Sequence, residues 1–145
     1  MNRIELTVSR TIAATPAEVF DVWLDPKSPG SPWFGPERAI VNASVDGLFY
    51  HCVRHEGRDW AHYGRFVRLD RPRVIEHTWM SEATRGLEST VVLTFEPNGA
   101  GTLVTLRHTN LLDDDMGRQH EQGWTFMLGA IADRFSSKAA RSPNA

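Results

Sequence analysis

The fold is decided by residues 8–23, which read VSRTIAATPAEVFDVW and join a strand to a helix. Apolar and polar side chains alternate with period two over residues 4–9, which predicts a half-buried strand that enters this stretch. The next three signals mark a helix start, because Thr15 is a good N-cap, Pro16 suits the first turn, and Glu18 completes a capping box. The stretch therefore predicts a strand followed at once by a short helix.

Short apolar runs separated by turn residues fill the middle of the chain, which is typical of an antiparallel meander. Asn98-Gly99 is a strong hairpin signal between two of these runs. We expect six further strands, at residues 39–44, 47–55, 59–69, 74–80, 89–95 and 103–109.

Three helical segments are expected. The first spans residues 16–24 and ends before Asp25-Pro26, and a proline-rich connector at 27–36 forms a second, short one. The long third helix starts in the acidic turn at 112–115, which suits the helix dipole. Its apolar side chains then recur at helical spacing: Trp124, Met127, Leu128, Ile131 and Phe135. Its glycines are Gly117, Gly123 and Gly129, and we expect the last two to allow close packing on the sheet.

This element order predicts an α+β fold. A curved antiparallel sheet of seven strands would wrap one long C-terminal helix, with two short helices between the first two strands. The apolar face of the long helix must be buried on the sheet. The space between the two layers is then the natural place for a ligand.

The composition of the chain excludes several classes of protein function. The chain has 145 residues, with 16 Lys and Arg against 18 Asp and Glu, and a formal charge of −2. That balance argues against nucleic-acid binding. The single Cys52 excludes an intramolecular disulfide and a cysteine-based zinc site, so a reducing compartment is expected. No apolar run reaches the length of a membrane span, and the N-terminus lacks a signal-peptide pattern.

Alternation along the strands places several rings and apolar side chains on one concave face. An apolar pocket with a few polar groups is the usual form of a small-molecule site. Phe20, Trp23, Trp33 and Phe34 are expected toward its entrance. The walls would be Trp60, His62, Phe66, Trp79, Phe95, Leu106, Trp124, Met127, Leu128 and Ile131, with His51, His77 and His108 as polar groups.

Catalytic chemistry has little support in the sequence. No nucleophile elbow, phosphate loop or dinucleotide motif is present. A buried histidine could still transfer a proton, and His77 and His108 are the weak candidates for that role. We expect no metal and no cofactor, because the histidines lack a ligand spacing typical of a metal site.

Across nearly the whole chain, an ordered set of motifs resembles one superfamily. The motifs are residues 8–23, Trp33-Phe34-Gly35-Pro36, Asp46-Gly47, Tyr63-Gly64-Arg65-Phe66, the run 73–79, the run 101–106, and Gly123-Trp124 with Leu128. In this order they resemble the SRPBCC superfamily, with the helix-grip fold of START and birch-pollen-allergen-like proteins. Within it, the chain is similar to the family of the C-terminal domain of the activator of the heat shock protein 90 ATPase.

The resemblance implies a helix-grip fold with a hydrophobic cavity, and it leaves the chemistry open. Binding of a hydrophobic or aromatic small molecule is the favoured interpretation. The alternatives are a cavity-based enzyme, of the polyketide cyclase, aromatase or isomerase type, and a co-chaperone-like interaction domain. A chaperone partner is not expected, because the eukaryotic activator has an additional N-terminal domain.

The expected organisation is one intracellular, cytoplasmic domain at residues 1–135, followed by a flexible tail at 136–145. The small polar residues of that tail favour fraying. An edge strand would allow a homodimer, and the sequence leaves the oligomeric state open.

Overall fold

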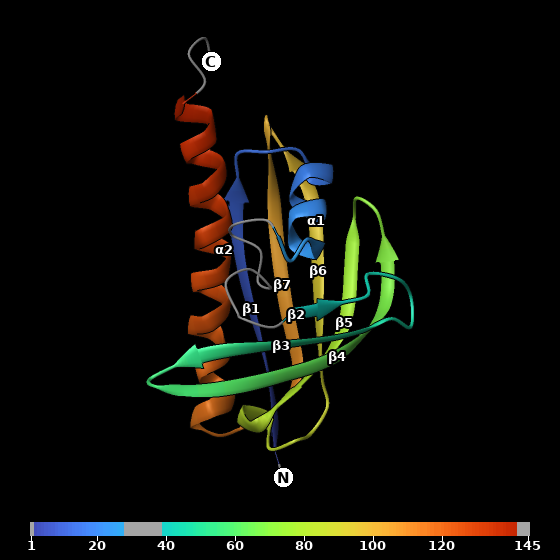
Figure 1. Cartoon of the computed structure of the whole chain (residues 1–145). Helices are drawn as coiled ribbons and strands as arrows, with labels where there is room; N and C mark the ends of the chain where they lie inside the picture. The colour runs from blue at the N-terminus through green and yellow to red at the C-terminus, as the bar shows by residue number, and fades with distance from the viewer. Residues whose placement is uncertain (1, 28–38, 142–145) are drawn as a thin grey trace.

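The computed structural model describes residues 2–27 and 39–141, without the side chains of 53–55 and 137–141. One seven-stranded sheet, with the order β1-β7-β6-β5-β4-β3-β2, forms the framework, and every neighbouring pair is antiparallel (Figure 1). The strands are β1 (Arg3–Ile12), β2 (Ala39–Val41), β3 (Leu48–His55), β4 (Arg58–Asp70), β5 (Val74–Ser81), β6 (Ser89–Asn98) and β7 (Gly101–Leu112). The predicted seven-stranded antiparallel sheet is confirmed.

Helix α1 (Pro16–Leu24) begins and ends at the predicted residues. Its capping box is formed, because the Glu18 backbone N–H donates to Thr15 Oγ1 at 3.2 Å and the Thr15 N–H donates to Glu18 Oε1 at 3.2 Å. The side chain of Phe20 meets Phe95 of β6 edge-on, with ring centroids 5.5 Å apart. Helix α1 therefore closes one end of the concave face.

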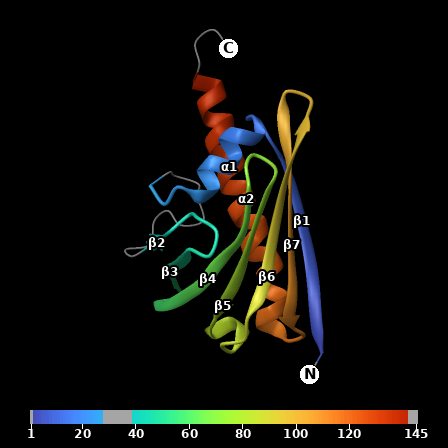
Figure 2. The ribbon, with the colours of Figure 1, turned by 90° about the vertical axis from the view of Figure 1, so that its right-hand side faces the viewer.

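Helix α2 (Asp115–Arg141) runs beside β1, and α1 lies on the same side of the sheet (Figures 1 and 2). The strands β3 and β4 cross over α2, so the sheet curls around it. The side chains that α2 buries against the sheet include Trp124, Leu128, Ile131 and Phe135. This is the predicted α+β helix-grip architecture.

The strand faces follow the predicted alternation. The inward side chains Ile75, His77 and Trp79 of β5 are buried, and β6 and β7 bury theirs in the same way. On β3 the inward Phe49 is 2% exposed whereas Leu48 is 64% exposed. One continuous apolar core therefore lies between the sheet and the helices.

The structure departs from the expected elements in four places. Strand β2 ends at Val41 because Asn42 begins a turn, in which the Ser44 N–H donates to the Asn42 carbonyl at 2.8 Å. A short 3-10 helix η1 (Glu82–Thr84) follows β5, where only a turn was predicted. Helix α2 continues to Arg141, so the segment expected as a tail from residue 136 is helical up to that point. The connector at 27–36, expected as a second short helix, lies outside the described residues from residue 28 onward.

Candidate functional site: a cluster of histidine and aromatic rings

Rings from five elements meet between the sheet and α2. They come from β3, β4, β5, β7 and α2, and we call them the ring cluster: Phe49, His51, His62, Phe66, His77, Trp79, His108, His120 and Trp124. Strand register explains part of this convergence, because His51 of β3 lies directly opposite His62 of β4. Five of the six histidines of the chain gather here.

Trp79 lies at the centre of the ring cluster. Its ring centroid is 4.7 Å from that of His62, 4.8 Å from that of Trp124 and 5.6 Å from that of His51. The side chain is 4% exposed. Its indole N–H is buried, and no acceptor among the described residues reaches it. A buried donor without an acceptor costs about 1–3 kcal/mol.

A hydrogen-bond chain fixes the ring of His108. The Trp124 Nε1–H donates to His108 Nδ1 at 2.9 Å, so the proton of the neutral ring lies on Nε2. That Nε2–H donates to Ser89 Oγ at 2.8 Å, and the Ser89 hydroxyl donates to the Trp79 carbonyl at 2.7 Å. Both ring nitrogens of His108 are therefore used in holding β5, β6, β7 and α2 together.

His62 and His120 are only half-buried, and each has its tautomer fixed by a backbone carbonyl. The Nδ1–H of His62 donates to the Trp60 carbonyl at 3.0 Å, and that of His120 donates to the Met116 carbonyl at 2.8 Å. Because a neutral imidazole carries one proton, Nε2 of each ring keeps a lone pair.

The histidines of the ring cluster are uncharged at neutral pH. Burial is the main cause, and it lowers the pKa of His51 to about 3, those of His62 and His77 to about 4, and that of His108 to about 2. Burial also lowers the pKa of His120. Repulsion between neighbouring imidazoles adds to the shift at His51, His62 and His108. The site is thus an apolar region with neutral hydrogen-bonding groups.

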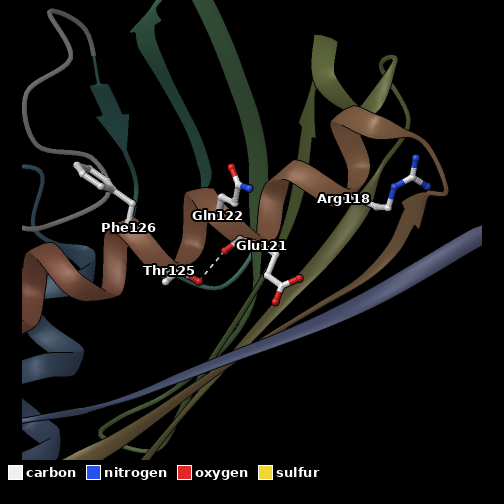
Figure 3. Close-up of a pocket in the computed structure, with 5 residues that line it drawn as sticks. All are labelled: Arg118, Glu121, Gln122, Thr125 and Phe126. Carbon is white, nitrogen blue, oxygen red and sulfur yellow. Dashed lines mark hydrogen bonds between the residues drawn. The ribbon is translucent and has the colours of Figure 1, made fainter.

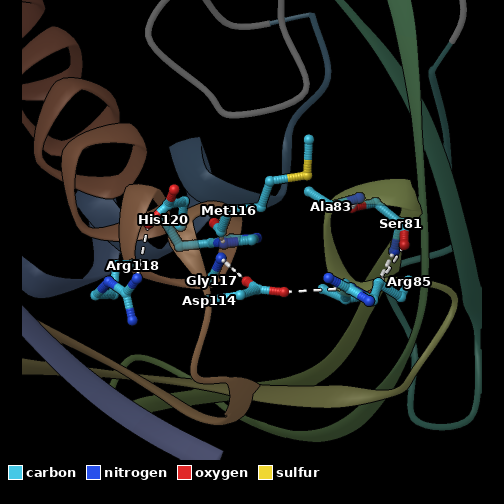
Figure 4. A network of polar contacts seen from close by, with 10 residues as sticks. Ser81, Ala83, Arg85, Asp114, Met116, Gly117, Arg118 and His120 are labelled. Atoms are coloured by element: carbon cyan, nitrogen blue, oxygen red, sulfur yellow. Dashed lines mark hydrogen bonds and ion pairs between the residues drawn. The ribbon is translucent and has the colours of Figure 1, made fainter.

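The N-terminal end of α2 is tied to the segment around η1 (Figure 4). Asp114 accepts a hydrogen bond from the Gly117 N–H at 2.7 Å and forms an ion pair with Arg85 at 3.3 Å. On the far side of the ion pair, the Ser81 hydroxyl caps η1 through the Ala83 N–H. These contacts set the position from which His120 enters the ring cluster.

Most of the predicted site residues lie together in this core. The buried ones are Phe20, Trp23, His51, Phe66, His77, Trp79, Phe95, Leu106, His108, Trp124, Leu128 and Ile131, and the half-buried ones are Trp60, His62 and Met127. Trp33 and Phe34 lie outside the described residues. Phe20 and Trp23, expected toward an entrance, are 3% and 0% exposed, because α1 packs them on Phe95 and Trp124.

Three residues of the site were not among the predicted ones. Phe49 lies two residues before His51 on the same strand, so period-two alternation could have placed it on the same face. His120 lies one helical turn before Trp124, so helical spacing could have placed it on the same face. Ser89 opens its strand as an ordinary polar residue, and nothing in the sequence marks its contact with His108.

A second feature, a surface depression, lies on the outer side of α2 (Figure 3). It is lined by Arg118, Glu121, Gln122, Thr125 and Phe126. Phe126 is 75% exposed, and the Thr125 hydroxyl donates to the Glu121 carbonyl at 2.8 Å. No predicted site residue lines this depression, which faces away from the ring cluster.

Within the described part of the chain, no three His, Cys, Asp or Glu side chains are placed to hold a metal ion. Among residues 2–27 and 39–141, no helix is long and apolar enough to cross a membrane.

The sheet, the gripped helix and the core between them define the class: the chain has the helix-grip fold of the SRPBCC superfamily. The sequence profile of the family described as "Activator of Hsp90 ATPase homolog 1-like protein" matches residues 13–136, and the chain belongs to this family. No curated protein matches the chain in sequence.

Solved structures share the fold at low sequence identity. Protein CV1439 from Chromobacterium violaceum is 20% identical, with a TM-score of 0.77 over 91% of this chain and 97% of that one. CalU16 from Micromonospora echinospora is 22% identical, with a TM-score of 0.70 over 94% and 79% of the two chains. A structure described as the Aha1 dimer from Colwellia psychrerythraea is 14% identical, with a TM-score of 0.70 over 91% and 96%.

Proposed function

We propose that the protein binds a small hydrophobic or aromatic molecule between the sheet and α2. The observation that carries the proposal is the buried indole N–H of Trp79, which has no acceptor among the described residues. An incoming acceptor would remove the cost of that unsatisfied donor. The half-buried Trp60, His62 and Met127 give this region partial access to solvent.

The binding energy would come mainly from apolar burial, at about 25 cal/mol per Å² before the cost of ordering the ligand. The proposed ligand-binding residues are the predicted set: Phe20, Trp23, Trp33, Phe34, His51, Trp60, His62, Phe66, His77, Trp79, Phe95, Leu106, His108, Trp124, Met127, Leu128 and Ile131. Neutral imidazoles suit an uncharged ligand, because burying a charge without a partner is costly.

A binding role agrees better with the histidine geometry than does acid–base chemistry by the two weak catalytic candidates. Both ring nitrogens of His108 are already hydrogen-bonded. His77 is 0% exposed, and its Nδ1–H donates to the Thr78 carbonyl at 2.8 Å. His108 therefore has no lone pair available to accept a proton from a bound molecule.

The first test uses naphthalene as an uncharged ring probe in titration calorimetry. We expect saturable binding to the native chain. Met127→Trp should weaken it about tenfold or more, because a larger side chain at this half-buried position competes with the ligand for space.

The matched control is Phe126→Trp, which introduces the same indole at the neighbouring, 75% exposed position. It should leave the naphthalene affinity within about twofold of the native value, since surface changes have small effects. Absence of saturable binding, or equal weakening by both variants, would contradict the proposal.

Three expectations stay predictions: a homodimer, a cytoplasmic location and a domain bounded at residues 1–135. The dimeric state named for the Colwellia structure is compatible with a homodimer of this chain. Among the strands that the structure describes, β1 and β2 are at the edges of the sheet and have one unpaired side. A cytoplasmic location and a binding domain bounded at residues 1–135 likewise rest on the sequence alone.

A further inference from the structure

The ring cluster places an acceptor, on His62, beside a donor that has no partner among the described residues, on Trp79. His62 donates its Nδ1–H to the Trp60 carbonyl at 3.0 Å, which leaves a lone pair on Nε2. Trp79 carries the buried indole N–H that no described acceptor reaches. The first group can only accept a hydrogen bond, and the second can only donate one.

These two groups belong to adjacent rings. The ring centroids of His62 and Trp79 lie 4.7 Å apart and the ring planes differ by 40°. At that spacing the two rings are in contact, so the acceptor and the donor belong to the same part of the ring cluster. A hydroxyl group fits this pair, because its O–H donates while its oxygen accepts.

The uncharged surroundings of His62 and Trp79 favour a neutral hydroxyl group. The other rings that pack on Trp79 carry no charge at neutral pH: Phe49, His51, His77, His108 and Trp124. Arg58 of the same strand stacks 4.2 Å over the Trp60 ring and is paired with Glu82. An acid or an amine would therefore enter the site as a poorly compensated charge.

We infer that the ligand is an uncharged ring compound bearing a hydroxyl group, of the phenol or enol class, whose O–H donates to His62 Nε2 and whose oxygen accepts from Trp79 Nε1–H. This inference rests on the proposed function, and it specifies the chemical class of the ligand. His62 and Trp79 are then the residues that determine specificity, and the remaining apolar rings supply contact area.

Three probes of nearly the same shape test it: naphthalene, 2-methoxynaphthalene and 2-naphthol. The first makes neither hydrogen bond, the second only accepts, and the third both accepts and donates. We expect the affinity to rise about fivefold at each step, as for one net hydrogen bond. In the ¹H–¹⁵N spectrum of the native protein, the Trp79 indole resonance should shift downfield with the second and third probes and not with naphthalene.

Substitutions test which hydrogen bond to the ligand is made by His62 and which by Trp79. His62→Phe should remove the advantage of 2-naphthol over 2-methoxynaphthalene, because phenylalanine has no acceptor at this position. Trp79→Phe should remove the advantage of 2-methoxynaphthalene over naphthalene. Tyr63→Phe is the matched control, because it is next to His62 in sequence, points to the opposite face of β4 and is 47% exposed. It should keep all three affinities.

The outcomes separate this inference from the proposed function. Equal affinities for the three probes, or an unshifted Trp79 resonance with 2-naphthol, would overturn the hydroxyl assignment while naphthalene binding still supports a ring-binding site. Failure of all three probes to bind would overturn both. The spectrum of the native protein decides the matter even where a variant does not fold.

Discussion

Ser89 joins three neighbouring strands of the sheet, β5, β6 and β7, through one hydroxyl group. It is 1% exposed, accepts from the His108 Nε2–H and donates to the Trp79 carbonyl. Ser89→Ala would leave a buried imidazole N–H without an acceptor, so we expect the free energy of unfolding to fall by about 1–3 kcal/mol. Urea unfolding followed by circular dichroism measures it.

Ser9→Ala on the exposed face of β1 makes the same chemical change without a buried partner, and it should stay within about 0.5 kcal/mol. Equal effects of the two substitutions would mean that the Ser89 hydroxyl has no special role. The sequence could not have singled out Ser89, because its importance depends on two partners, Trp79 and His108, that are distant along the chain. The inward positions of Trp79 and His108, in contrast, follow from period-two alternation alone.

At the scale of elements, the glycines of α2 correct one sequence-based expectation. A Cβ at Gly123 would meet nothing within 4 Å, and one at Gly129 would meet only Arg10 Nη1 at 3.9 Å, so neither position allows close packing on the sheet. The close approach is at Gly117, where a Cβ would overlap the Leu112 carbonyl. Helical geometry explains this, because Gly117 lies seven residues before Trp124 and shares its buried face.

Two substitutions in α2 should therefore have opposite signs. Gly123→Ala should stabilise the protein by up to about 1 kcal/mol, because alanine is the better helix former and the position is exposed. Gly117→Ala should destabilise it, because the first turn must shift away from Leu112. Thermal unfolding of both variants in one buffer gives the comparison, and a loss of stability in Gly123→Ala would show that this glycine has a role in packing.

The bounds of α1 can be predicted from the sequence and the end of α2 cannot, for a physical reason. Helix α1 was located to the residue because Thr15, Pro16 and Glu18 act within one turn and need no tertiary context. The end of α2 cannot be located in this way, because the small polar residues from Ser136 onward carry no signal for the end of a helix besides their composition. Convergence of five histidines also depends on how far the sheet curls, which no local pattern of residues specifies.

For the whole molecule, the ring cluster makes stability depend on pH. An unfolded histidine has a pKa near 6.5, whereas those of His51, His62 and His77 are about 3, 4 and 4 in the folded chain. Between pH 6.5 and about 4 the unfolded chain therefore binds protons that the folded chain does not. Each such histidine lowers the free energy of unfolding by about 1 kcal/mol per pH unit over this window.

We therefore expect the urea midpoint to be constant above pH 7.5 and to fall steeply between pH 6.5 and 4.5. Asp21 acts in a separate window, because its hydrogen bond to Arg71 lowers its pKa below the usual 3.8, so its contribution is lost only at more acid pH. His51→Phe should reduce the slope by about one proton while keeping a ring in the cluster. An unchanged midpoint from pH 7.5 to 5.5 would mean that these imidazoles reach solvent in the folded state, in which case the apolar setting of the proposed ligand site would fail with them.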